Sequence, residues 1–119
     1  MTTTRELAEE FAALCRENRG REAADRHWAD DVVSIEAMDG PMARLEGREA
    51  VLKKHDWWES TFEMHGGSVE GPFVHGDQFA LRFEMETTNR ETGERRTDRE
   101  IALYTVRNGK VVEERFFYA

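Results

Sequence analysis

The sequence predicts an α+β fold in which helices come first and a curved, mostly antiparallel sheet follows. Apolar residues recur at helical spacing in the first half of the chain, whereas residues 79–118 alternate between apolar and polar side chains, as half-buried strands do. Two tight turns divide the second half, one at Glu91-Thr92-Gly93 and one at Asn108-Gly109. Because Asn-Gly is the strongest short-range hairpin signal, we expect a three-stranded meander here.

Three helices are expected ahead of the meander. Thr3 followed by Glu6 is a capping box, so the first helix begins near Thr4, and Gly20 is expected to end it in a left-handed conformation. The other expected elements are helices over 21–28 and 48–59, a strand over 32–36, a loop over 37–45, and a strand over 62–65 and 68–74 interrupted by a bulge at Gly66-Gly67.

The hairpin turns also predict which side chains share a face of the sheet. The turn at Asn108-Gly109 sets Leu103 opposite Glu114, and a three-residue loop over 91–93 sets Phe83 opposite Ile101. The predicted core face holds Phe79, Leu81, Phe83, Met85, Ile101, Leu103, Val112 and Phe116, with the polar Thr97, Arg99, Glu114 and Tyr118 among them. A buried carboxylate is costly unless it has a partner or lines a cavity, so Glu114 is the first candidate site residue.

Composition excludes several kinds of partner. A chain of 119 residues is long enough for one domain, over residues 1–119. Its net charge of −8 is unsuited to nucleic acid or to anionic membrane surfaces. The lone Cys15 excludes an internal disulfide and fits the reducing cytoplasm, and no apolar run approaches the ~20 residues of a membrane span. We therefore expect a cytoplasmic domain that binds neither nucleic acid nor membrane.

The order of these elements and three segments of sequence resemble the SnoaL-like group of the nuclear transport factor 2 and ketosteroid isomerase superfamily. The segments are GREAVLKKHDWW, EGPFVHGDQFALRF and EIALYTVRNGKVVEERFFY. The resemblance covers essentially the whole chain and implies a conical α+β barrel with one pocket between sheet and helices, and a homodimer packed through the sheet. Members include isomerases, polyketide cyclases, dehydratases, epoxide hydrolases and non-catalytic binding modules, so the fold does not settle the function.

Three residues are candidates for proton-transfer chemistry. Glu114 is expected inside the pocket, where a buried carboxyl suits a general acid or base, or else in a structural ion pair with Arg99. Tyr118, on the same face, is expected to have one of two roles. It either donates a hydrogen bond to a carbonyl or enolate oxygen of the ligand, or is a core residue whose hydroxyl reaches solvent. His65 either turns inward at the bend as an acid–base partner or faces solvent.

A second set of residues is expected to bind the ligand. In the resembled fold Glu36 lies near the pocket mouth, beside a loop that contains Met38, although it could equally be a solvated strand end. Trp28 and Trp58 would supply apolar walls. The full predicted set is Trp28, Glu36, Met38, Trp58, Phe83, Arg99 and Leu103.

No cofactor or metal is expected. The four histidines are scattered, without the HxH or HExxH spacing of metal sites, and no phosphate-cradling glycine loop precedes a helix. Cys15 lies on the apolar stripe of a helix, where a cysteine packs as a small hydrophobe.

Two functions remain open. The first is a cofactor-free isomerase, cyclase or hydratase in which Glu114 or His65 moves a proton while Tyr118 stabilises an oxyanion. The second is a non-catalytic protein that binds a small, largely apolar molecule in the same pocket. In the resembled cyclases an acidic residue closes the last strand, where this chain has Ala119, which favours the binding protein. The opposite sheet face, expected to form the homodimer, would hold Glu84, Glu100, Tyr104, Arg115 and Phe117.

Overall fold

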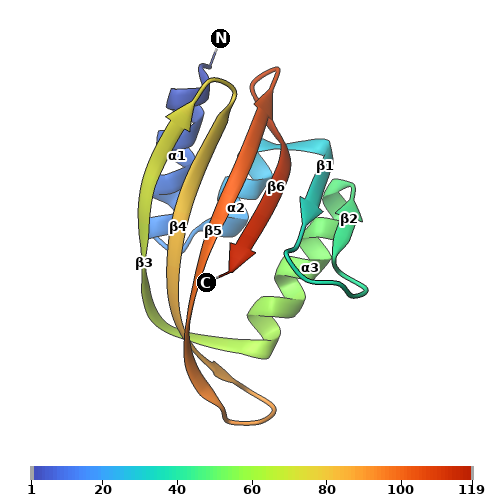
Figure 1. Cartoon of the computed structure of the whole chain (residues 1–119), viewed down its shortest axis with the longest axis vertical. Helices are drawn as coiled ribbons and strands as arrows, with labels where there is room; N and C mark the ends of the chain where they lie inside the picture. The colour runs from blue at the N-terminus through green and yellow to red at the C-terminus, as the bar shows by residue number, and fades with distance from the viewer. Residues whose placement is uncertain (1, 119) are drawn as a thin grey trace.

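In a computed structural model that describes residues 2–118, three helices cover one face of a curved six-stranded sheet (Figure 1). The elements are α1 (Thr4–Arg16), α2 (Gly20–His27), β1 (Trp28–Ile35), β2 (Arg44–Glu46), α3 (Arg48–Thr61), β3 (Phe62–His75), β4 (Gln78–Asn89), β5 (Arg95–Arg107) and β6 (Lys110–Tyr118). The predicted α+β class, with helices packed on a mostly antiparallel sheet, is confirmed. Ala119, whose identity separates this sequence from the resembled cyclases, lies outside the described residues.

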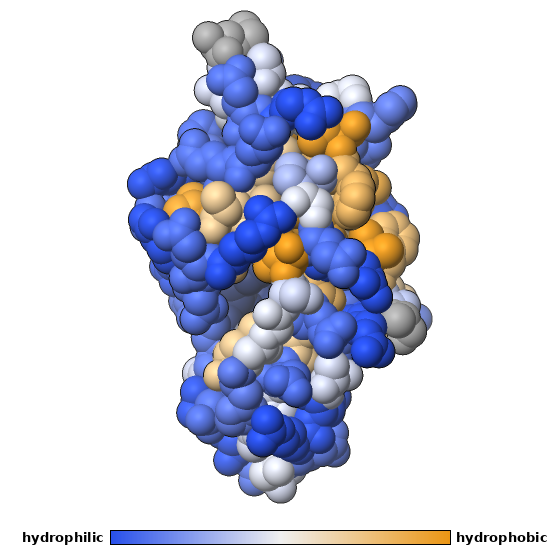
Figure 2. Space-filling view, turned by 90° about the vertical axis from the view of Figure 1, so that its left-hand side faces the viewer, coloured by the Kyte–Doolittle hydropathy of each residue, from blue (hydrophilic) through white to orange (hydrophobic). Residues whose placement is uncertain are grey.

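The sheet is curved but not closed. Its strand order is β2-β1-β6-β5-β4-β3, and β1 and β6 run parallel whereas the other neighbours run antiparallel. The described part measures 45 × 27 × 24 Å, because the end of the β4–β5 hairpin projects beyond the main body (Figure 1). Between that projecting end and the main body the surface is hollowed (Figure 2). No helix within residues 2–118 is long and apolar enough to cross a membrane.

The first helix begins as expected but ends earlier. The Thr3 side chain accepts a hydrogen bond from the Glu6 amide at 3.1 Å, which is the predicted cap. The expectation that Gly20 ends this helix is wrong. Asn18 takes the left-handed conformation, with φ of 59°, and the Arg19 amide bonds to the Leu14 carbonyl at 2.8 Å. Because asparagine tolerates that conformation, the helix closes in a Schellman motif and Gly20 is free to start α2.

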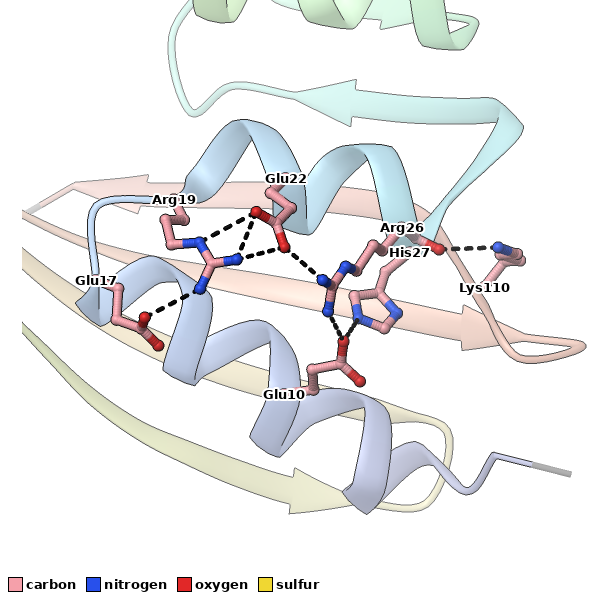
Figure 3. A network of polar contacts seen from close by, with 7 residues as sticks. All are labelled: Glu10, Glu17, Arg19, Glu22, Arg26, His27 and Lys110. Atoms are coloured by element: carbon pink, nitrogen blue, oxygen red, sulfur yellow. Dashed lines mark hydrogen bonds and ion pairs between the residues drawn. The ribbon is translucent and has the colours of Figure 1, made fainter.

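A network of charged side chains joins α2 to α1 (Figure 3). Arg26 contacts Glu10 at 2.7 Å and Glu22 at 2.6 Å, while the Lys110 ammonium donates to the Arg26 carbonyl at 2.9 Å. His27 lies 3.4 Å from the same Glu10 carboxylate. Burial lowers the pKa of His27. Since exposed ion pairs contribute little free energy, this network mainly fixes how α2 lies on α1.

The predicted bulge in the long strand β3 is confirmed. The register with β4 shifts between Met64 and Gly66. A Cβ atom on Gly67 would overlap the carbonyl oxygen of Glu84, so glycine is required where the two backbones approach closely. The short strand β2 begins at Arg44, within the last residues of the stretch 37–45 that the sequence predicted to be a loop, and ends at Glu46.

The predicted register of the meander is wrong by one residue at both hairpins. Phe83 pairs with Glu100 rather than with Ile101. The reason is the Asn89 side chain, which accepts hydrogen bonds from the Glu91 and Thr92 amides at 2.9 and 3.3 Å and lengthens the loop to four residues.

In the second hairpin, Val106 pairs with Val111 as predicted, but one extra residue then enters β6. The register shifts there, so that Tyr104 rather than Leu103 pairs with Glu114. Val112 is therefore a bulge residue and not the core residue that the sequence suggested.

These two shifts turn β5 over. Tyr104 is buried against Phe11 and Phe79, with ring centroids 4.9 and 4.8 Å apart, whereas Ile101 is 45% exposed on the outer face. Ile101 and Leu103 were therefore assigned to the wrong face, as were Glu100 and Tyr104. The centre of the core comprises Leu7, Phe11, Trp28, Val32, Val51, Phe79, Leu81, Tyr104 and Phe116.

This arrangement predicts unequal effects of two truncations in neighbouring strands. Leu81→Ala should lower the free energy of unfolding by about 2–5 kcal/mol because it opens a cavity at a fully buried position. Ile101→Ala, on the outer face, should cost less than about 1 kcal/mol. Urea unfolding followed by circular dichroism measures both, and equal losses would contradict the observed register.

Candidate functional site

Polar side chains gather on the inner face of the sheet where α3 crosses β1 and β6. Lys54, on α3, is buried, and its ammonium donates to the Ser34 hydroxyl at 2.5 Å and to the Glu36 carboxylate at 2.8 Å. The same ammonium lies 4.9 Å from the centre of the Phe116 ring. A core position on a helix would ordinarily be apolar, so this buried ion pair marks the region as more than packing.

Glu114 and His55 form a second pair beside the first. The Glu114 carboxyl is 1% exposed, and its Oε1 lies 3.1 Å from Nε2 of His55. The imidazole also packs against Trp28, with ring centroids 5.1 Å apart, and remains partly exposed. When Nε2 donates to this oxygen, Nδ1 of the neutral ring is the nitrogen that is free to accept.

Glu100 is the third carboxyl of the cluster. It is half-buried and, among residues 2–118, its side chain has no hydrogen-bond or ion-pair partner. Burial, and then the nearby carboxylates of Glu36 and Glu114, raise the pKa of Glu100 to about 7, which His55 and Lys54 only partly offset. This group therefore changes charge near neutral pH.

Tyr118 closes the cluster at the end of β6. Its hydroxyl donates a hydrogen bond to Oε2 of Glu36. Burial and this hydrogen bond raise the pKa of Tyr118, so the phenol stays protonated and acts only as a donor or a neutral acceptor. In the sheet Tyr118 pairs with Glu100, which brings the two side chains to the same end of the site.

The structure brings together four of the residues predicted from the sequence, namely Trp28, Glu36, Glu114 and Tyr118. It places others elsewhere. The expected ion pair between Arg99 and Glu114 is absent, because Arg99 lies on the outer face and contacts Glu84 at 3.1 Å. His65 is exposed on β3, where Nε2 contacts the Thr88 hydroxyl at 2.6 Å.

The remaining predicted residues surround the site loosely or face away from it. Met38 is 62% exposed in the loop after β1, and Leu103 is on the outer face. Trp58 packs against Phe62, with ring centroids 5.4 Å apart, and Phe83 is half-buried at the edge of the core.

Sequence reasoning missed three members of the cluster: Lys54, His55 and Glu100. His55 lies on the apolar stripe of α3, and that placement was a usable signal. Glu100 was hidden by the register error, which had put it on the outer face. Lys54 gave no signal, because a single lysine in a charged helix is most often solvated.

One depression in the surface of the described residues lies elsewhere. Its volume is about 500 Å³, and it is an open hollow at the bulge of Val112, on the outer face. Its lining comprises Ala29, Asp31, Val33, Thr105, Arg107, Asn108, Lys110, Val112 and Glu113. None of these side chains belongs to the cluster around Glu114. The hollow and the cluster of ionisable side chains therefore lie on opposite faces of the sheet, with the cluster on the inner face. Within residues 2–118 no three His, Cys, Asp or Glu side chains are arranged to hold a metal ion.

The SnoaL-like domain family matches residues 1–118, which is nearly the whole chain. The chain belongs to the SnoaL-like domain family. A structure of a proposed SnoaL-like polyketide cyclase from Mesorhizobium loti is 52% identical, with a TM-score of 0.96 over 98% of this chain and 100% of that one. Among curated proteins no match was found.

More distant solved structures share the SnoaL-like fold. An NTF2-like protein from Burkholderia thailandensis is 16% identical, with a TM-score of 0.84 over 100% of this chain and 92% of that one. A protein with a ketosteroid isomerase-like fold from Catenulispora acidiphila, in complex with trimethylamine, is also 16% identical, with a TM-score of 0.74 over 98% and 88% of the two chains. At this identity the likeness concerns the fold alone.

The raised pKa of Glu100 predicts how the stability of this SnoaL-like domain depends on pH. Because its pKa rises from 4.5 to about 7 on folding, the folded state holds more protons between these values. The contribution of Glu100 to the free energy of unfolding should therefore fall as pH rises from 4.5 to 7, by roughly 1–3 kcal/mol. Glu100→Gln should remove this loss and stabilise the protein at pH 8.

Thermal and urea unfolding between pH 4.5 and 8 test this dependence. The matched control is Glu113→Gln, which makes the same change in net charge on the outer face of β6. If Glu100→Gln is no more stable than the wild type at pH 8, the pH dependence does not come from Glu100. The same conclusion follows if Glu113→Gln stabilises the protein as much as Glu100→Gln does.

Proposed function

We propose that this SnoaL-like domain binds a small, largely apolar molecule between α3 and the inner face of the sheet, and moves a proton on it without a cofactor. The observation that carries the proposal is the contact of the buried Glu114 with the partly exposed His55, next to the half-buried Glu100. Ionisable groups are costly to bury, and a core optimised for stability alone would replace them with apolar side chains.

The arrangement supplies the parts of acid–base catalysis. Nδ1 of His55 is the base, and Glu114 holds the ring and stabilises the imidazolium that forms. Glu100 is part protonated near neutral pH, so its neutral form can donate a hydrogen bond or a proton to an oxygen of the substrate. Abstraction of a proton from carbon next to a carbonyl, followed by reprotonation elsewhere, is the reaction type that these groups support.

The similarity to the proposed cyclase from Mesorhizobium loti adds to this support. Polyketides are rich in carbonyl groups, and the two chains are 52% identical over nearly their full lengths. A non-catalytic binding protein is the second candidate, because the same aromatic walls and polar groups would also hold a ligand that is not turned over.

Proton exchange into a small ketone separates the two candidates. With cyclic and aryl ketones in D2O, the wild type should speed the appearance of deuterium next to the carbonyl, measured by NMR. Glu114→Gln should slow this exchange by roughly 10²-fold or more. Its free energy of unfolding should hold or rise, because glutamine keeps a hydrogen bond to His55 while it removes a buried charge.

Glu113→Gln serves as the control and should exchange protons as the wild type does. Ketone binding without exchange, seen as a shift in melting temperature, would favour the non-catalytic candidate. If the ketones neither bind to the protein nor exchange protons in its presence, the proposed function is wrong.

We also propose that two copies pack through the outer face of the sheet. Phe117 is 47% exposed and Ile101 is 45% exposed there, beside the ion pair of Arg99 and Glu84. Apolar groups ringed by charges are typical of homodimer surfaces.

Light scattering at micromolar concentration should give twice the chain mass of 13.8 kDa. The double variant Ile101→Glu and Phe117→Glu should give the monomer mass, because four added carboxylates would face one another across the two-fold interface. A wild-type monomer would contradict the dimer.

A cytoplasmic location completes the proposal. Cys15 is a free thiol, and burial raises its pKa to about 12, so it remains a protonated core side chain. A free, unreactive cysteine suits a reducing compartment.

A further inference from the structure

Negative charge outweighs positive charge around Glu100. The ionisable groups that face it or its immediate neighbours are Glu36, Asp98, Tyr104, Glu114 and Tyr118 from the sheet, and Lys54 and His55 from α3. Lys54 forms an ion pair with Glu36, and His55 contacts Glu114. The nearby arginines of β5 and β6, Arg99 and Arg115, contact Glu84 and Glu113 on the outer face. Among residues 2–118, Glu100 therefore has no cationic side chain as a partner.

The cluster already shows how it holds an ammonium group. The Lys54 ammonium is bound by the Glu36 carboxylate, the Ser34 hydroxyl and the face of the Phe116 ring. Carboxylate oxygens combined with an aromatic face form a favourable site for a desolvated cation. Glu100 lies beside these groups, because it pairs across the sheet with Tyr118, whose hydroxyl donates to the same Glu36 carboxylate.

We propose that the site is selective for small organic cations, namely protonated or quaternary amines with an apolar body, and discriminates against carboxylates and phosphates. This inference rests on the proposed function only in that the inner face must bind a small molecule. The cationic group pairs with Glu100, and the apolar body packs against the aromatic side chains of the inner face. An anion in the same place would meet the carboxylates of Glu36, Glu100 and Glu114 in a poorly solvated space.

Binding of a cation is then linked to the ionisation of Glu100. Because the pKa of Glu100 is about 7, roughly one tenth of the molecules carry its charge at pH 6 and about nine tenths at pH 8. A permanent cation that pairs with the ionised form should bind about tenfold more tightly at pH 8 than at pH 6, and should release a proton from the protein.

Three probes of similar size test the selectivity: benzyltrimethylammonium, benzyl alcohol and benzoate. The first has a charge that does not change with pH, so any pH dependence comes from the protein. Isothermal titration calorimetry at pH 6 and pH 8, in buffers of different ionisation enthalpy, measures affinity and proton release together. We expect the cation to bind most tightly, the alcohol more weakly and benzoate not at all.

Glu100→Gln identifies the carboxyl responsible. It should weaken benzyltrimethylammonium about tenfold at pH 8, abolish the pH dependence and leave benzyl alcohol unchanged. Glu113→Gln, with the same change in net charge on the outer face, should bind all three probes as the wild type does.

The outcomes separate this inference from the proposed function. If benzyl alcohol or a ketone binds and the cation binds no better, the inference is wrong and the proposed function stands. If the cation binds equally to wild type and Glu100→Gln, Glu100 is not the recognising group and the inference is wrong. Lack of binding by every probe and every ketone contradicts both.

Discussion

The contact between Glu114 and His55 is the interaction on which the site depends. It places a carboxyl that is 1% exposed against a partly exposed imidazole, at a distance of 3.1 Å. Without that partner the carboxyl would be an uncompensated polar group in an apolar layer, at a cost of several kcal/mol. With it, α3 is tied to β6 through a contact between two polar side chains.

The other ionisable groups follow from this contact. The side chain of Glu114 points inward because the bulge at Val112 sets the register of β6 against β5. The same register brings Glu100 to the inner face, where the carboxylates of Glu114 and Glu36 oppose its ionisation. Backbone geometry in two hairpins therefore decides the charge of a side chain near neutral pH.

Much of the fold could be predicted from the sequence, and the parts that could not have identifiable causes. Hydrophobic period, the capping box at Thr3 and the Asn108-Gly109 turn predicted the element order, because each is a local signal. The register could not be derived. It depends on an Asn89 side chain that caps its own loop and on an extra residue at Val112, and neither changes the alternating pattern. Glu114 was found because an acid on an apolar face is conspicuous, whereas Lys54 and His55 join it only through the packing of α3.

Titration of the glutamate side-chain carboxyls by carbon-detected NMR, with Glu100 assigned through the Glu100→Gln variant, tests the central claim most directly. The claim is that a cluster of ionisable groups on the inner face is held in mutual electrostatic contact. It predicts that the Glu100 resonance titrates with a midpoint of about 7, and that Glu114→Gln lowers this midpoint by removing one opposing carboxylate. A Glu100 midpoint near 4.5, unchanged in Glu114→Gln, would contradict it.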